Sequence, residues 1–234
     1  MSKLKPKQNK NIAIDTTELT KTLIKMRDLF IKDPTKAVRS KAFITLFQDY
    51  CENELRKRGI EDLRFKIEKE AKFKVEGTKV EADVGVLNER GEPVLIVDVR
   101  SQMTSIGKNF NNYIRMKAGE VESIHEQFPT CSVGLVYLHP LSDLPTKKPV
   151  GPVGSFNYEA ASNQLFFKIR RADTQLTKYE NVAYCVIDFN ANPPELSDVF
   201  PSQVELKLEN FFDNIVAAFR KKVVAPPDAS GATR

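Results

Sequence analysis

An unbroken apolar run at residues 94–97 ends in the aspartate Asp98, and this combination constrains the fold more than any other stretch of the chain. Such a run indicates a strand that is buried on both faces. A carboxylate at the end of a buried strand is costly unless it is paired or binds a cation. The pattern therefore predicts a covered sheet and a specific partner for Asp98.

A second aspartate, Asp83, lies on the preceding predicted strand, residues 79–87, and a turn at 88–93 separates the two strands. An antiparallel hairpin across this turn would bring the carboxylates of Asp83 and Asp98 close together. Paired hard oxygen ligands suit Mg²⁺ far better than zinc or a thiol-based site. The spacing predicts a Mg²⁺ site and metal-assisted phosphodiester chemistry.

The alternation of side chains along a strand predicts which residues share a face with these two aspartates. Asp98, Arg100 and Gln102 point to one face of their strand, because side chains alternate with a period of two. One surface is therefore expected to present Asp83, Asp98 and Arg100 together, with Glu81 at its edge.

A third acidic candidate, Glu54, lies in a helix predicted at residues 35–58. It falls on the apolar stripe that Phe43, Phe47 and Tyr50 form at helical spacing. A glutamate on such a stripe needs a partner or a metal. Two interpretations follow: Glu54 joins the metal site, or it pairs with Arg58 one helical turn later.

The predicted elements alternate between helices and strands. A hairpin that leads through a crossover helix into a further strand predicts an α/β fold, with a mixed central sheet flanked by helices on both faces. A single domain is expected over residues 16–221, with a core at about 36–138, further strands and a helix at 164–221, and disordered tails at 1–15 and 222–234. Helices are expected at 16–32, 35–58, 103–128 and 203–221, strands at 63–74, 79–87, 94–100, 131–138, 164–170 and 182–189, and a long loop at 139–163.

Composition narrows the setting of the chain. The formal charge of +5 is compatible with a polyanionic partner. Three widely spaced cysteines argue against a disulfide framework, so we expect buried thiols in a reducing, cytoplasmic setting. No apolar run approaches the roughly 18 residues that span a bilayer, so no membrane association is expected.

The segment that follows the second acidic strand is rich in side chains that hydrogen-bond phosphates or base edges. It straddles a predicted helix start, where free N–H groups attract phosphate. Two interpretations remain: the segment contacts DNA, or it is a polar N-cap region with asparagines on a solvated face. The expected DNA contacts are Ser101, Gln102, Ser105, Lys108, Asn109, Asn112 and Arg115.

Asp83, then Asp98-Val99-Arg100 on the next strand, then a helix and an apolar strand form a pattern that resembles the PD-(D/E)xK nucleases, the restriction-endonuclease-like superfamily. The resemblance covers roughly residues 36–138. It implies a restriction-endonuclease-like fold and a catalytic site in which Asp83, Asp98 and Glu54 hold Mg²⁺.

One residue departs from the family pattern. Arg100 lies where these nucleases usually have a lysine that contacts the attacking water. Arginine stays protonated, so Arg100 can stabilise charge on the reacting phosphate but cannot act as a base. Lys108 or Lys79 are alternative sources of an ammonium group, and a site inactivated at Arg100 is the competing interpretation.

The resemblance implies a Mg²⁺-dependent DNA endonuclease. The leading hypothesis is a type II restriction enzyme that cleaves double-stranded DNA as a homodimer, because duplex cleavage needs two active sites and a two-fold dimer mirrors a palindromic site. No organic cofactor is expected. The alternatives are a catalytically inactive DNA-binding or assembly module of the same fold, and a repair or recombination nuclease of that fold.

Overall fold

The computed structural model describes residues 12–63, 65–104, 106–144, 156–171 and 174–223. The expected tails at 1–15 and 222–234 lie mostly outside these ranges. Where they are described, they are part of the fold: the Asp15 side chain caps the first helix, and the last helix continues to Val223.

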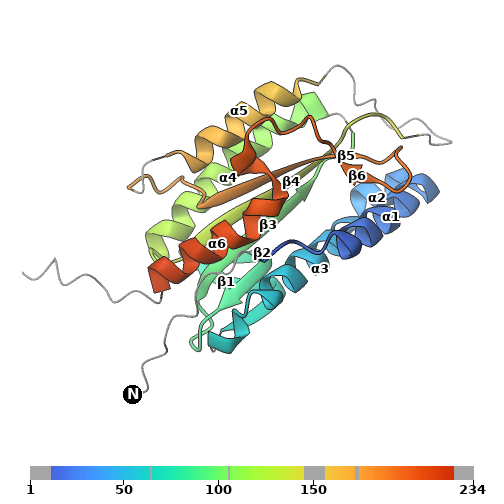
Figure 1. Cartoon of the computed structure of the whole chain (residues 1–234). Helices are drawn as coiled ribbons and strands as arrows, with labels where there is room; N and C mark the ends of the chain where they lie inside the picture. Colours follow the sequence, from blue (N-terminus) through green and yellow to red (C-terminus); the bar gives the residue numbers. More distant parts are fainter. Residues whose placement is uncertain (1–11, 64, 105, 145–155, 172–173, 224–234) are drawn as a thin grey trace, which may run out of the picture.

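A six-stranded mixed sheet forms the centre of the molecule, in the order β1-β2-β3-β4-β5-β6 (Figure 1). The first three strands form an antiparallel meander, β3, β4 and β5 run parallel, and β6 pairs antiparallel with β5. The strands are β1 (Lys66–Val75), β2 (Thr78–Leu87), β3 (Pro93–Ser101), β4 (Ser132–Pro140), β5 (Asn181–Asp188) and β6 (Glu195–Leu196).

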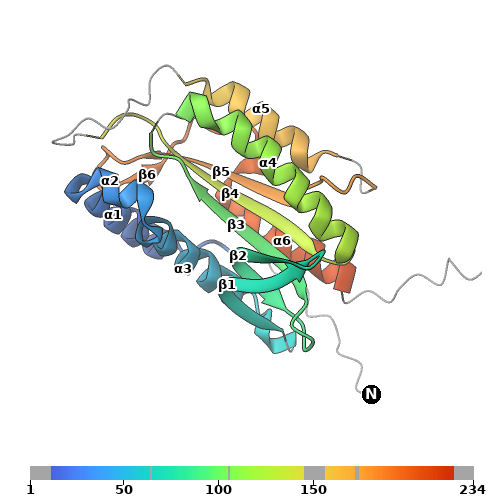
Figure 2. The ribbon, with the colours of Figure 1, turned by 180° about the vertical axis from the view of Figure 1, so that it is seen from behind.

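Helices cover both faces of this sheet (Figures 1 and 2). One face packs against α1, α3 and α6, and the other packs against α4 and α5. The helices are α1 (Thr16–Lys32), α2 (Pro34–Arg39), α3 (Lys41–Lys57), α4 (Ile106–Gln127), α5 (Tyr158–Ile169) and α6 (Leu208–Val223), with short 3₁₀ turns η1 (Glu61–Leu63) and η2 (Val204–Leu206). The expected α/β architecture, a mixed sheet between two helical layers, is confirmed.

The apolar strands lie where their sequences predict. Every residue of β4 is buried, and β3 is buried from Pro93 to Val99, because both strands lie in the middle of the sheet under two helical layers. The three cysteines, Cys51, Cys131 and Cys185, are buried free thiols. No helix among the described residues is long and apolar enough to cross a membrane.

The helix expected at 35–58 is interrupted. Ser40 has an extended backbone (φ −96°, ψ 148°), which ends α2 and lets α3 begin at Lys41. Serine is a weak residue in helix interiors, because its hydroxyl competes for nearby backbone groups. The apolar stripe of Phe43, Phe47 and Tyr50 is buried as expected, and it belongs to α3.

The strand expected at 164–170 is wrong, because these residues belong to α5 and to the turn that ends it. The apolar run that starts at Leu165 resembles a strand, but the buried residues of α5 are spaced three and four apart, as in a helix: Tyr158, Ala161, Ser162 and Leu165. Phe167 is 71% exposed. The loop expected at 139–163 is correspondingly shorter, since β4 reaches Pro140 and α5 starts at Tyr158; residues 145–155 lie outside the described ranges.

Candidate functional site

Asp83 and Asp98 come together where β2 and β3 separate. The antiparallel pairing ends at Val84 opposite Val97; Asp83 precedes Val84 and Asp98 follows Val97, so both aspartates lie just beyond the last pair. Beyond that point, Oδ2 of Asp83 accepts a hydrogen bond of 2.7 Å from the backbone N–H of Val99. The Asp83 carboxylate thus takes the place of a backbone carbonyl in the ladder.

An irregularity in β1 and β2 explains the position of Asp83. Glu70, which lies between the pairs Lys69–Val84 and Ala71–Ala82, has a positive φ of 48°. Val84 packs towards the α1, α3 and α6 layer, whereas Ala82 packs towards α4. The side chains of β2 therefore point to opposite faces of the sheet before and after Asp83. This change leaves the Asp83 side chain between β2 and β3.

Helix α3 contributes Gln48 to Asp83. The Nε2 atom of Gln48 donates a hydrogen bond of 2.6 Å to Oδ1 of Asp83, and the Gln48 side chain is buried. Both carboxylate oxygens of Asp83 therefore have a hydrogen-bond donor. These contacts fix the orientation of Asp83 from the helix on one side and from β3 on the other.

Asp98 pairs with a lysine of α4. Asp98 is 3% exposed, and the Lys117 ammonium lies 3.1 Å from its Oδ2 atom. Lys117 also donates a hydrogen bond of 2.8 Å to Glu120, one helical turn further along α4. We call Asp83, Asp98, Lys117 and Glu120 the carboxylate–lysine cluster; it reaches the surface at Glu120, whose side chain is 31% exposed.

Burial controls the charges of this cluster. It raises the pKa of Asp98 to about 6, with Lys117 acting in the opposite direction and Glu120 and Asp83 raising that pKa further. Burial also raises the pKa of Asp83, against the Val99 N–H, Lys117 and Gln48. Burial by itself lowers the pKa of Lys117, but pairing with Asp98 and Glu120 raises it above its ordinary value. Three carboxylates thus surround the buried ammonium of Lys117, and the exposed Lys41 acts on Asp83 as a second cation.

Arg100 lies at the exposed edge of the cluster. Its guanidinium stands 4.8 Å from the centre of the Tyr113 ring, and Tyr113 precedes Lys117 by one turn of α4. Arg100 is exposed at the end of β3 while Asp98, two residues earlier, is buried. The positive charge next to the buried aspartate is therefore that of Lys117.

The structure places Glu54 elsewhere. It is fully buried and pairs with Arg58 at 2.7 Å and with Lys57 at 3.0 Å, which corresponds to the pairing interpretation. No contact among the described residues joins Glu54 to Asp83 or Asp98. Gln48, the residue of α3 that reaches Asp83, lies six residues earlier, about 9 Å along the helix. The structure therefore does not bring Glu54 into contact with the two strand aspartates, as the metal-site interpretation expected.

The expected DNA-contacting residues divide into three groups. Gln102 is buried: it is 6% exposed, and its Oε1 accepts a hydrogen bond of 2.8 Å from Tyr137. Ser101 is half-buried, whereas Asn109, Asn112 and Arg115 are exposed on α4. Ser105 and the side chain of Lys108 lie outside the described residues.

Two residues expected near the acidic site, Lys79 and Glu81, are also exposed. Lys79 lies on β2, and Glu81 pairs with Lys41 at 2.5 Å.

Sequence reasoning missed Lys117 and Gln48, although a signal for both exists. Lys117 follows Phe110 by seven residues and precedes Val121 by four, so it lies on the apolar stripe of α4. Gln48 precedes the buried residues Cys51 and Leu55 at the same helical spacing. The rule that selected Glu54, a polar side chain on an apolar stripe, also selects these two residues.

The described part of the chain holds no group of three or more His, Cys, Asp and Glu side chains arranged to hold a metal ion. A cation site here would instead use the two strand carboxylates, with the remaining ligands from water or from a bound phosphate. Comparisons with protein-family models, with curated proteins and with solved structures found no match to this chain. The chemistry of the carboxylate–lysine cluster is therefore the basis for assigning a function.

Proposed function

We propose that this protein is a Mg²⁺-dependent nuclease that hydrolyses phosphodiester bonds in DNA. The observation that carries the proposal is the carboxylate–lysine cluster: Asp83 and Asp98 lie on adjacent strands just beyond the last residue pair and interact electrostatically, and the Lys117 ammonium lies beside Asp98. Two carboxylates and an ammonium are the groups that metal-assisted phosphodiester cleavage uses.

The donor set of the cluster suits Mg²⁺. Its ligands would be carboxylate oxygens, which hard divalent cations prefer. The pKa of Asp98, raised to about 6, indicates that one ammonium does not fully compensate the buried charge. A divalent cation held by Asp83 and Asp98 would supply the missing positive charge. When bound, it lowers the pKa of a coordinated water and offsets charge on the leaving oxygen.

Each residue of the cluster has a distinct role in this proposal. Gln48 and the Val99 N–H hold the Asp83 carboxylate in a fixed orientation. Lys117 supplies the fixed positive charge that stabilises the anionic phosphate, in place of a lysine at the position of Arg100. The exposed guanidinium of Arg100 binds a neighbouring phosphate oxygen as a permanent cation.

The order of elements around the cluster supports the assignment to the PD-(D/E)xK nucleases. The strands β2 and β3 carry one aspartate each and run antiparallel, and α4 then leads to the parallel strand β4. This is the order that the resemblance implies, and a restriction-endonuclease-like fold is part of the proposal. A fold does not establish an activity, so the proposal depends on the cluster itself.

The most specific form of the proposal is a type II restriction enzyme. The exposed residues Asn109, Asn112 and Arg115 give α4 a polar face that suits base edges and phosphates. Cleavage of both strands of double-stranded DNA needs two active sites, so a homodimer is the expected assembly.

A second candidate is a DNA-binding or assembly module without catalytic activity. The observation that favours it is the 3.1 Å ion pair between Lys117 and Asp98, since an ammonium can neutralise a buried carboxylate without any metal. In that case the cluster would serve stability alone. The two candidates differ in whether Mg²⁺ has an effect.

A plasmid-nicking assay separates the candidates. Purified protein is incubated with supercoiled plasmid in Mg²⁺ or in EDTA, using wild type, Asp83→Asn and Asp98→Asn. We expect Mg²⁺-dependent cleavage by the wild type and background cleavage by both variants, with DNA binding retained. Asp28→Asn is the matched control, because Asp28 is an exposed aspartate of α1.

Two other results would change the assignment. Absence of Mg²⁺-dependent cleavage across varied DNAs, with binding intact, would favour the non-catalytic module. Cleavage confined to branched or single-stranded substrates would favour a repair or recombination nuclease over a restriction enzyme, which produces discrete fragments from double-stranded DNA.

A further inference from the structure

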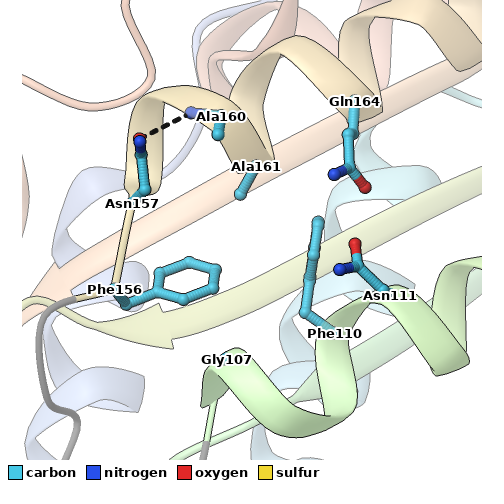
Figure 3. Close-up of a pocket in the computed structure, with 8 residues that line it drawn as sticks. All are labelled: Gly107, Phe110, Asn111, Phe156, Asn157, Ala160, Ala161 and Gln164. Carbon is cyan, nitrogen blue, oxygen red and sulfur yellow. Dashed lines mark hydrogen bonds between the residues drawn. The ribbon is translucent and has the colours of Figure 1, made fainter.

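A pocket of about 430 Å³ lies between the N-terminal halves of α4 and α5 (Figure 3). Its volume falls within the roughly 300–1,000 Å³ of small-ligand sites. The carboxylate–lysine cluster belongs to the same helix: Phe110, which lines the pocket, precedes Lys117 by seven residues, or about 10 Å along α4.

Two aromatic rings form the apolar wall of the pocket. The ring centres of Phe110 and Phe156 are 5.9 Å apart, with an angle of 75° between their planes. The buried ring of His139 packs against both, at 5.0 Å from Phe156 and 5.7 Å from Phe110. This edge-to-face packing holds the wall in place and offers a surface for a planar ligand.

Two carboxamides face each other across the opening. Asn111 comes from α4 and Gln164 from α5, and Figure 3 shows their side chains directed towards one another. No hydrogen bond joins either carboxamide to another described residue. The oxygen of Asn157, by contrast, already accepts a hydrogen bond of 2.8 Å from the Ala160 N–H. Asn111 and Gln164 therefore have donors and acceptors free for a ligand.

The pocket contains no charged side chain among the described residues that line it. None of these described lining residues would give a phosphate or carboxylate a counter-charge, and they favour a neutral ligand over an anionic one. The lining instead suits a neutral, planar group with paired donors and acceptors at its edge. Nucleobases have these properties, since carboxamides bind base edges and aromatic rings stack on base faces.

We infer that this pocket receives an unpaired nucleobase of the DNA substrate, with the sugar and phosphates outside. The inference rests on the proposed nuclease function and specifies its substrate class. A base in a duplex is stacked and paired, so only an unpaired or extruded base presents both its face and its edge. In a double-stranded substrate, this base would be extruded from the duplex close to the cleavage site.

The test uses DNA with a single 2-aminopurine, whose fluorescence changes when the base leaves its stack. Binding is measured in EDTA, with the probe in a single-stranded oligonucleotide and in the matched duplex. We expect wild type to change the probe fluorescence in both DNAs, because the base can enter the pocket directly from a single strand and by extrusion from the duplex. Loss of a hydrogen bond lowers affinity about fivefold, so Asn111→Ala and Gln164→Ala should each show at least that loss.

A blocking variant and a control complete the experiment. Ala160→Trp places a large side chain at an exposed position of the pocket, and it should abolish the fluorescence change without unfolding the protein. Asn214→Ala is the matched control, because Asn214 is an exposed asparagine of α6 on the opposite face of the sheet. Circular dichroism of each variant verifies folding.

The outcomes separate this inference from the proposed function. Unchanged binding in the three pocket variants, or a probe fluorescence that does not change when wild type binds either DNA, would overturn the base-binding pocket whether or not the wild type cleaves DNA. Pocket-dependent binding in a protein that never cleaves with Mg²⁺ would support the pocket and refute the nuclease. Loss of binding in Asn214→Ala as well would also contradict the inference.

Discussion

Burial and ion pairing act in opposite directions on Asp98. Burial disfavours its charged form, and Lys117 at 3.1 Å favours it, yet the pKa remains raised to about 6. The folded protein therefore carries a carboxylate whose ionisation opposes folding. Functional groups often have such a cost, because a site selected for chemistry is not selected for stability.

The first prediction concerns the effect of pH on stability in EDTA. The folded pKa of Asp98 lies above its ordinary value of 3.8, so the folded state holds this proton more tightly than the unfolded state does. Protonated Asp98 therefore contributes to the free energy of unfolding. This contribution is fully present below about pH 4 and is lost as the pH rises through about 6. A shift of this size corresponds to about 3 kcal/mol.

Asp98→Asn should remove this loss of stability at higher pH, because asparagine does not ionise. Urea unfolding should show the variant gaining up to about 3 kcal/mol over wild type between pH 4 and pH 7, while Mg²⁺-dependent cleavage disappears. Asp28→Asn should leave the pH dependence unchanged. A variant that is less stable than wild type at pH 7 would instead mark Asp98 as a structural ion-pair partner.

The second prediction assigns the catalytic positive charge. Lys117→Met should lower Mg²⁺-dependent cleavage by about 100-fold or more, as removal of a single electrostatic stabiliser does in other enzymes. Arg100→Lys should retain or raise cleavage, because it introduces the lysine usually found at this position in the nucleases that the chain resembles. Single-turnover cleavage rates provide the measurement. Loss of cleavage in Arg100→Lys together with normal rates in Lys117→Met would reverse the two roles.

At the scale of elements, an ion-pair network joins α3, the segment before α1 and α6. Arg58 pairs with Glu54 at 2.7 Å and with Asp213 of α6 at 2.6 Å. Its Nη2 atom also donates a hydrogen bond of 2.6 Å to the backbone oxygen of Ile12. These contacts are buried or half-buried, so this network serves as a structural connection between distant segments.

The third prediction follows from that network. Arg58→Met leaves Glu54 buried with a single ammonium partner and should lower the free energy of unfolding by about 3 kcal/mol or more. Arg56→Met, on the same helix but in exposed pairs, should cost less than about 1 kcal/mol.

The same network bears on the role of Glu54. Glu54→Gln should keep Mg²⁺-dependent cleavage; a stable but inactive Glu54→Gln protein would return Glu54 to the metal site.

The fourth prediction concerns the packing of α6 on β4. A Cβ atom at Gly134 would lie 2.9 Å from the Phe211 ring and 3.3 Å from Ile215, both in α6. Gly134→Ala should therefore destabilise the protein by about 1–3 kcal/mol, because an overpacked core must shift. Gly119→Ala is the control: nothing lies within 4 Å, and helix propensity should stabilise α4 by roughly 0.5–1 kcal/mol. Thermal unfolding of both variants tests the pair.

At the scale of the whole molecule, α4 connects the candidate functional features. It carries Lys117 and Glu120 of the cluster, the exposed residues Asn112 and Arg115, and one side of the base pocket. This helix lies on one face of the sheet together with α5, while α1, α3 and α6 cover the other face (Figure 2). DNA is therefore expected to bind on the side of α4 and α5.

The fifth prediction concerns this binding surface. The net charge of +5 implies that DNA affinity falls as salt rises, since each neutralised phosphate releases a counterion. Arg115→Ala should weaken binding and reduce the slope of log affinity against log salt concentration by about one. Lys25→Ala, which removes an exposed cation of α1, should change neither.

Sedimentation with a short duplex measures assembly in the same samples; a strictly monomeric complex would contradict the homodimer.

The repeated spacing of apolar residues made the central elements predictable. The buried strands β3 and β4, the hairpin of β2 and β3 and the apolar stripe of α3 follow from residue order, because local periodicity sets the direction of each side chain. The same periodicity failed at residues 164–170, where a short apolar run fits a strand and a helix equally well. There the burial of Leu165 in the core that α5 shares with the sheet decided in favour of the helix.

Asp83 and Asp98 were predictable as neighbours, because a hairpin turn connects their strands in the sequence. Their actual partners were not, since Gln48 and Lys117 come from helices whose positions depend on how each packs on the sheet. The order of residues sets the face on which a side chain lies. Contacts between separate elements depend on the angle and distance at which those elements pack, and only the folded molecule determines these.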